Sequence, residues 1–317
     1  MTTRTIAVNL DLKEKELEWI QNHAQDWNVI AGADLSAEEL LQAEIILNWE
    51  KGVRDILSES NRLRWVQTWS AGVNRLPLEQ LKAKGIHLTS ANGVHAYPIS
   101  ETIFAMLLGF TRRIDTYVRQ QQLKKWEHAN LRKEIHEKTI GILGIGAIGL
   151  ETARIAKAFG MKVLGMRYSG RSAEYVDQMY KQEELDKLLP QCDYVVITLP
   201  LTEQTKDMFT TKEFKLMKEN AFLVNIGRGP IIKEADLIQA LEKNEIAGAG
   251  LDVFVEEPLA VDSPLWEMEN VIITPHTAGS TEYYTERVIR DIFLPNFKAY
   301  LQTGKPTTNL VNYSRGY

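Results

Sequence analysis

The sequence predicts an α/β fold made of two doubly wound parallel-sheet domains. Short apolar stretches alternate with amphipathic, helix-like stretches along the chain, which is the pattern of β–α–β units. A length of 317 residues is typical of two domains rather than one. A glycine-rich motif between a strand-like and a helix-like stretch lies inside a second alternating series.

The composition argues against several classes of protein. The net charge of −5 is spread evenly, so we expect no nucleic acid and no membrane as a partner. Apolar stretches are too short to span a bilayer, and residues 1–5 lack a secretory core, so we expect a cytoplasmic protein. The single Cys192 excludes an internal disulfide and a cysteine-based metal site, and we expect it to be a packing residue and expect no metal.

The first hundred residues are expected to form the first sheet. The expected strands are 5–9, 29–31, 44–47, 65–68 and 87–89, and the expected helices are 12–23, 37–42 and 78–84. Ser36, with Glu39 three positions later, is a capping pair that marks the start of helix 37–42.

The remainder is expected to form a second sheet. Pro98 precedes a long amphipathic helix, 101–122, and a polar segment, 124–137. Further strands are expected at 139–143, 162–166, 194–199, 221–225, 247–251 and 271–274, and helices at 147–159, 212–217 and 233–243. The tail, 281–301, is expected to be helical with a break at Pro295 and to pack on the first domain.

The glycine motif is typical of a dinucleotide site. Gly144, Gly146 and Gly149 form a G-x-G-x-x-G between strand 139–143 and helix 147–159. The glycines allow a tight turn, a close approach to a pyrophosphate and close packing of helix on strand. The helix N-terminus offers N–H groups and a positive dipole end to the phosphates.

The turn after the next strand favours NADP(H), with NAD(H) as the other possible cofactor. Arg167 stands near the place where an Asp or Glu usually binds the ribose 2′-hydroxyl. A guanidinium there pairs with a 2′-phosphate, and Ser169 and Arg171 lie in the same turn. The alternative is that Arg167 and Arg171 are an ordinary solvated pair. We expect a dinucleotide-binding domain at 99–285 and a substrate domain at 1–98 plus 286–317.

Residues suited to acid–base chemistry follow three expected strands. Arg228, Asp252 and His276 each lie just beyond a strand, and the carboxyl ends of parallel strands share one edge. Arg228 is suited to clamp a carboxylate, and His276 is suited to protonate the oxygen of a 2-keto acid. Glu257 would orient the imidazole, although Glu256 is an equal candidate. Alone, either Arg228 or His276 would suggest a solvated turn residue or a buried histidine.

Six stretches resemble the D-isomer-specific 2-hydroxyacid dehydrogenase family over nearly the whole chain. They are residues 70–74, 144–149, 199–202, 225–229, 251–258 and 274–280. The resemblance implies Rossmann-like and flavodoxin-like domains with an active-site cleft between them. It implies an oxidoreductase that transfers hydride between NADP(H) and a small 2-keto acid or D-2-hydroxy acid, such as glyoxylate or hydroxypyruvate.

The resemblance also implies individual roles. Arg228 anchors the substrate, His276 donates the proton, and Glu257 pairs with it because the family's acid directly precedes a proline. Asp252 holds the nicotinamide carboxamide. The remaining implied contacts are the backbones of Gly72 and Val73 for the substrate carboxylate, Ala147 and Ile148 for the pyrophosphate, and Leu199, Pro200, Thr205, Ile226, Gly227 and Arg228 for the cofactor cleft.

The chain departs from the family's common pattern at three positions. Arg167 replaces the usual Asp, which resembles the NADP-using glyoxylate/hydroxypyruvate reductase branch. Trp69 and Thr277 also differ and bear on substrate choice. Trp49, Trp69, Tyr97 and Trp126 are candidates for an aromatic pocket wall, or else for core packing or an interface.

Partners and an alternative function follow from the same resemblance. Family members usually form homodimers through the cofactor domain, and helix 101–122 with segment 124–137 is the expected contact region. The alternative function is that of a dinucleotide-sensing transcriptional corepressor, which uses the same fold to bind peptides.

Overall fold

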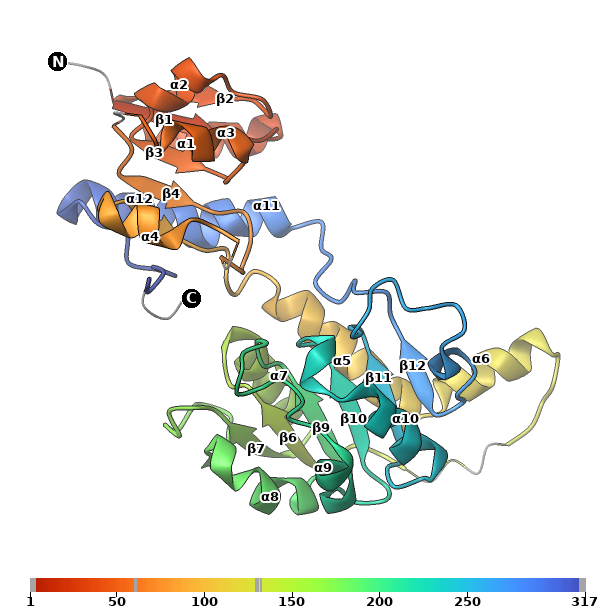
Figure 1. Cartoon of the computed structure of the whole chain (residues 1–317). Coiled ribbons are helices and arrows are strands. Elements are labelled where there is room, and N and C mark those ends of the chain that lie inside the picture. The colour runs from red at the N-terminus through yellow and green to blue at the C-terminus, as the bar shows by residue number, and fades with distance from the viewer. Residues whose placement is uncertain (1–3, 60–61, 74, 129–130, 132, 314–317) are drawn as a thin grey trace. The chain divides into compact units, whose positions relative to one another are not determined.

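The computed structural model describes residues 4–59, 62–73, 75–128, 131 and 133–313, and it confirms two parallel-sheet α/β units (Figure 1). Unit 1 comprises Met1–Val94 and Thr281–Tyr317, and unit 2 comprises His95–Ser280. The division therefore falls at 94/95 and 280/281, where the sequence led us to expect 98/99 and 285/286.

Unit 1 is built on a five-stranded parallel sheet in the order β2-β1-β3-β4-β5, which is the flavodoxin order. The strands are β1 Arg4–Val8, β2 Trp27–Ala31, β3 Ile45–Leu47, β4 Trp65–Gln67 and β5 His87–Thr89. The helices within residues 1–94 are α1 Glu14–His23, α2 Ala37–Gln42, α3 Lys51–Ile56 and α4 Leu78–Ala83.

The C-terminal tail returns to unit 1, as predicted. It forms α11 (Tyr284–Arg287), a π-helical segment (Val288–Phe293) and α12 (Leu294–Thr303), and it packs Phe293 and Phe297 on one face of the sheet. The expected break at Pro295 is a change of helix type: the π-helical segment ends at Phe293 and α12 begins at Leu294, with the proline in its first turn.

Unit 2 contains a seven-stranded parallel sheet in the order β12-β11-β10-β9-β6-β7-β8. Counted from its first strand, this is the Rossmann order with one additional edge strand. The strands are β6 Thr139–Leu143, β7 Lys162–Met166, β8 Gln178–Tyr180, β9 Tyr194–Ile197, β10 Phe222–Asn225, β11 Gly248–Leu251 and β12 Val271–Ile273.

Helices cover both faces of this sheet (Figure 1). One face packs against α5 (Ala96–Thr111) and α7 (Ala147–Ala158), and the other against α8 (Leu185–Leu188), α9 (Thr211–Leu216) and α10 (Glu234–Glu242). Cys192 lies fully buried in the second of these cores, where burial raises the pKa of its thiol to about 12. Short 3-10 turns are Gln182–Glu184, Leu189–Gln191, Gly229–Ile231 and Pro264–Trp266.

The single helix expected at 101–122 is two helices. Arg113 has a left-handed φ of 57°, which ends α5 and separates it from α6 (Ile114–Gln122). The two differ in burial, because α5 packs its apolar face into the core and no residue of α6 is buried. In Figure 1, α6 extends away from the sheet of unit 2.

The chain passes between the units twice, after Val94 and after Ser280. On the unit 2 side the two connecting segments are joined, because His95 Nδ1 lies 2.9 Å from the Gly279 carbonyl oxygen. In the part of the chain that the structure describes, no helix has the length and apolar character to cross a membrane. Within the same residues, no three His, Cys, Asp or Glu side chains are grouped so that they could hold a metal ion.

Candidate active site

The glycine loop after β6 has a backbone that only glycine fits. Gly144 has a φ of 110°, and a Cβ there would lie 2.7 Å from Thr198 Oγ1. A Cβ at Gly149 would overlap the Gly144 carbonyl oxygen, so the start of α7 packs directly on the turn. A Cβ at Gly146 would meet nothing within 4 Å. The loop is closed on the protein side and open at Gly146, which fits a bound pyrophosphate.

This loop lies at the switch point of the sheet, between β6 and β9. Ala147 and Ile148 form the first turn of α7, and no side chain caps that turn. The hydroxyl of Thr198, which directly follows β9, donates to the Gly144 carbonyl at 2.7 Å and links the loops after the two strands. The N–H groups of this turn and the positive end of the helix dipole are therefore available to bind a phosphate.

Basic side chains gather at the turn after β7. Arg167 is partly buried; its Nη2 donates to the Ser172 carbonyl at 3.3 Å, and its buried Nε has no hydrogen-bond partner among the described residues. The Lys181 side chain lies against Gly170, with Cε 3.1 Å from the position of a Cβ there. Arg171 is exposed in the same turn, and its N–H donates to Ser169 Oγ at 3.4 Å. These cations fit a 2′-phosphate.

Sequence reasoning missed Lys181. It follows β8, a three-residue strand with a single buried side chain that the apolar pattern did not predict. Recognition of that strand would have placed Lys181 at the same sheet edge as the Arg167 turn.

Arg228 is held by the strand end that precedes it. Asn225, the last residue of β10, is buried; its Oδ1 accepts the Gly227 N–H and its Nδ2 donates to the Arg228 carbonyl, each at 3.1 Å. A Cβ at Gly229 would overlap the Phe254 backbone. The exposed guanidinium donates from Nη1 to the Gly227 carbonyl at 2.6 Å. The sequence did not identify Asn225 as the residue that shapes this turn.

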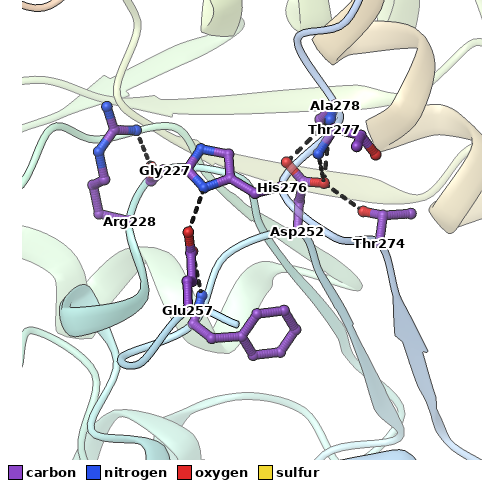
Figure 2. Close-up of polar contacts among 9 residues, drawn as sticks. Gly227, Arg228, Asp252, Glu257, Thr274, His276, Thr277 and Ala278 are labelled. Carbon is purple, nitrogen blue, oxygen red and sulfur yellow. Dashed lines mark hydrogen bonds and ion pairs between the residues drawn. The ribbon is translucent and has the colours of Figure 1, made fainter. Parts of the chain in front are cut away.

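His276 and Glu257 form the central pair of the site. His276 Nδ1 donates to Glu257 Oε2 at 2.6 Å, and Glu257 Oε1 accepts the Phe254 N–H at 3.0 Å (Figure 2). Glu257, not Glu256, makes this contact, so the structure separates two residues that sequence logic alone did not. The carboxylate fixes the imidazole tautomer and leaves Nε2 for a substrate.

The electrostatics of the pair favour an ionised carboxylate. Burial alone would raise the pKa of the Glu257 carboxyl, but hydrogen bonds from His276 and from the Phe254 N–H outweigh it. The charges of His276 and Arg228 add to this, and the net pKa lies below the ordinary value. Arg228 is therefore close enough to act on Glu257, although they follow different strands.

Asp252 lies beneath the loop that carries His276. It directly follows β11, is 2% exposed, and accepts hydrogen bonds from the Thr274 hydroxyl and from the N–H groups of Thr277 and Ala278 (Figure 2). Arg228, Asp252, Glu257 and His276 therefore lie together in unit 2.

The other residues implied by the resemblance lie as follows. Leu199 and Pro200 follow β9, and the Thr205 hydroxyl donates to the Pro200 carbonyl at 2.7 Å, so Thr205 closes that loop. Ile226 and Gly227 follow β10 and are buried. Gly72 and Val73 lie in unit 1, after β4, where Ser70 Oγ donates to the Gly72 carbonyl at 2.8 Å. Asn74 of the same stretch lies outside the described residues.

The four candidate aromatic residues have different environments. Trp49 and Trp69 are partly buried against the cores of unit 1, and the Trp69 carbonyl accepts the Tyr284 hydroxyl at 2.7 Å. Tyr97, in the first turn of α5, is about half exposed, and Trp126 is 98% exposed. Trp126 is therefore not a core residue of this chain.

Comparison with known proteins identifies the family. The family model described as "D-isomer specific 2-hydroxyacid dehydrogenase, NAD binding domain" matches residues 104–278. The chain is 35% identical over 311 residues to glyoxylate/hydroxypyruvate reductase B of Serratia proteamaculans, covering 95% of this chain and 94% of that protein.

Solved structures agree with this relationship. The crystal structure of a D-isomer specific 2-hydroxyacid dehydrogenase family protein from Aeromonas salmonicida has a TM-score of 0.80 and 32% identity, covering 98% of this chain and 99% of that one. An NADPH-dependent glyoxylate/hydroxypyruvate reductase from Sinorhizobium meliloti, solved with NADP and sulfate, has a TM-score of 0.77 and 28% identity, covering 99% and 100%. The chain belongs to the D-isomer specific 2-hydroxyacid dehydrogenase family and is an NAD(P)-dependent oxidoreductase.

Proposed function

We propose that this protein reduces small 2-keto acids to D-2-hydroxy acids and prefers NADPH to NADH. The observation that carries the proposal is the 2.6 Å contact of His276 Nδ1 with Glu257 Oε2, near Arg228 and on the same sheet as the glycine loop. The relative named glyoxylate/hydroxypyruvate reductase B supports glyoxylate and hydroxypyruvate as substrates. Its match across nearly the whole chain favours an enzyme over the corepressor-like alternative.

Each side chain has a defined task in this reaction. When bound, NADPH supplies the hydride that reduces C2 of the keto acid. Arg228 uses one N–H on the Gly227 carbonyl and retains others for bidentate pairing with the substrate carboxylate. His276 Nε2 gives a proton to the carbonyl oxygen, while Glu257 holds the ring and favours its protonated form. The backbone N–H groups of Gly72 and Val73, in unit 1, stay a prediction from the family resemblance as further carboxylate donors.

The chain offers contacts to three parts of the cofactor: the pyrophosphate, the nicotinamide and the 2′-phosphate. The glycine loop with Ala147 and Ile148 takes the pyrophosphate, and Asp252 takes the nicotinamide carboxamide. Leu199, Pro200 and the backbone at Ile226–Gly227 line the cofactor site. Arg167, Ser169, Arg171 and Lys181 take the 2′-phosphate, and the unpartnered Nε of Arg167 supports this assignment. NADH is the second, weaker cofactor.

A panel of keto acids tests the reaction. We expect glyoxylate and hydroxypyruvate to be reduced with a higher kcat/KM than phenylpyruvate, and NADPH to give a higher kcat/KM than NADH. His276→Ala should lower kcat by roughly 10²–10⁴-fold, because general acid catalysis is lost. NADPH binding, measured by calorimetry, controls for the fold of this variant. Near-normal turnover in His276→Ala would remove it as the proton donor.

A charge reversal tests the cofactor preference. Arg167→Asp should weaken binding of 2′,5′-ADP and NADPH and strengthen binding of NADH, because an acceptor replaces a cation. Lys212→Asp, an exposed lysine on α9, makes the same change in net charge and is the matched control. If both variants bind both cofactors as the wild type does, the 2′-phosphate is not bound at this turn.

The oligomer proposed is a homodimer that uses α6. Ile114 and Val118, one turn apart on this helix, are each about half exposed, and Leu123 and Trp126 continue the apolar surface. Segment 124–137 follows directly, although residues 129, 130 and 132 lie outside the described part. A second copy that covers α6 would bury this surface.

A further inference from the structure

The loop that carries the proposed proton donor contains a residue in a disfavoured backbone conformation, His276 itself. The His276 loop, residues 274–278, follows β12, and His276 has a φ of 52°. A left-handed backbone is disfavoured for a residue with a Cβ, so neighbouring contacts must hold it. The His276 side chain is 50% exposed and makes its hydrogen bond to Glu257, another loop residue. Packing of the ring is therefore a poor explanation for the order of this loop.

Asp252 bonds to the loop on both sides of His276. Its Oδ1 accepts the Thr274 hydroxyl at 2.6 Å, the Thr277 N–H at 2.9 Å and the Ala278 N–H at 3.2 Å. Asp252 is buried directly after the neighbouring strand, β11, so it offers a fixed acceptor (Figure 2). Hydrogen bonds to an ionised group are stronger than those between neutral groups.

The two carboxylate oxygens of Asp252 accept different numbers of hydrogen bonds. Oδ1 takes three donors, while Oδ2 takes only the Ala278 N–H, at 3.2 Å. A carboxylate has about four acceptor positions, so Oδ2 keeps capacity for a further donor. The proposed bond to the nicotinamide carboxamide can therefore use Oδ2 while Oδ1 holds the loop, and the two tasks can be tested separately. Thr274 bonds Oδ1 alone.

We propose that Thr274 is a positioning residue: its hydroxyl, through Asp252 Oδ1, holds the His276 loop so that His276 meets both Glu257 and the substrate. The inference rests on the proposed function, because it takes His276 as the proton donor. It adds a residue that touches neither substrate nor cofactor. Without the hydroxyl, the N-terminal side of the loop loses its bond to the buried carboxylate, and the ring samples orientations away from Glu257.

Three variants test this role. Thr274→Val keeps the shape of the side chain and removes the donor, and Thr274→Ser keeps the donor. Thr210→Val is the matched control, because Thr210 Oγ1 also donates to a carboxylate, Glu213 Oε2, at 2.7 Å in the same unit but at the start of α9. Thr210→Val should lower stability only.

The expected results separate positioning from general destabilisation. Thr274→Val should lower kcat about 10-fold or more, as loss of a hydrogen bond to a charged group implies, with binding of NADPH within about 2-fold of wild type. The pH above which reduction fades should fall, because the imidazole meets Glu257 less often. Thr274→Ser should restore kcat and the pH profile, and Thr210→Val should change neither.

Amide hydrogen exchange, followed by mass spectrometry, gives a readout that needs no turnover. The N–H groups of Thr277 and Ala278 should exchange faster in Thr274→Val than in the wild type or Thr210→Val. Unchanged exchange and unchanged kcat would overturn the inference. Faster exchange in a protein whose wild type reduces no keto acid would overturn the proposed function and leave the loop contact in place. If Thr274→Val fails to fold, Thr274→Ala takes its place in every arm.

Discussion

At the scale of single residues, Glu257 is the carboxylate partner of the proposed proton donor, His276. Its carboxyl pKa lies below the ordinary value, so the partner of His276 stays ionised further into acid. A carboxyl whose pKa is lowered in the folded state makes its full contribution to stability at pH values above its ordinary pKa. That contribution is lost as pH falls through the lowered value. Glu257 should therefore remain ionised at a pH where a glutamate of ordinary pKa is already protonated.

We predict that Glu257→Gln lowers the pH at which reduction fades. An amide can still accept from His276 Nδ1, but it no longer favours the charged imidazole. The measurement is kcat/KM against pH for the wild type and the variant. Glu256→Gln is the matched control, because Glu256 is the adjacent exposed carboxylate and His276 bonds to Glu257 instead. If Glu257→Gln leaves the dependence of kcat/KM on pH unchanged, Glu257 does not act on the His276 ring.

The residues of the site were not equally predictable. Arg228 and His276 could be found because each follows a strand, and parallel strands bring their carboxyl ends to one edge. Asn225 and Thr274 could not be assigned from sequence, because their roles depend on the direction in which a short polar side chain points. Lys181 could not be assigned because its strand has only three residues.

At the scale of elements, prediction was accurate where the local signals were complete. Helix α2 has the bounds 37–42 that the capping pair predicted, and Ser36 Oγ donates to Glu39 Oε2 at 2.7 Å. Strands β6 and β7 also have the predicted bounds, because each is a five-residue, largely apolar run that ends before a glycine or a charged residue.

Prediction failed where tertiary contacts decide the outcome. Helix α3 and strand β8 were not expected, since each is short and lacks a strong apolar period. The break at Arg113 has no glycine or proline to mark it, and the apolar pattern continues from α5 into α6. That pattern is satisfied in α5 by the sheet of unit 2, whereas no residue of α6 is buried.

At the scale of the whole molecule, two separate sets of cores support two units. The returning tail covers one face of the unit 1 sheet. We predicted this because residues 281–301 are too few to form a domain of their own. Unit 2 is continuous in sequence and has a core on each face of its sheet. Outside these cores, α6 carries exposed apolar side chains, on which the proposed homodimer rests.

We predict that the protein sediments as a dimer at micromolar concentration. Ile114→Asp combined with Val118→Asp should raise the dimer Kd at least about 10-fold, because each buries an unpaired charge in the interface. Leu301→Asp, an exposed leucine on α12 of unit 1, is the matched control and should leave the dimer intact. A monomeric wild type, or a double variant that sediments as the wild type does, would contradict the prediction.

The contact of His95 with the Gly279 carbonyl has a consequence for engineering. The first and last segments of residues 95–280 adjoin, so this half of the protein is arranged as an insert with neighbouring ends. A gene segment encoding residues 95–280 can be exchanged between relatives as a single cassette with two junctions. Chimaeras made this way would keep unit 2 constant and vary unit 1.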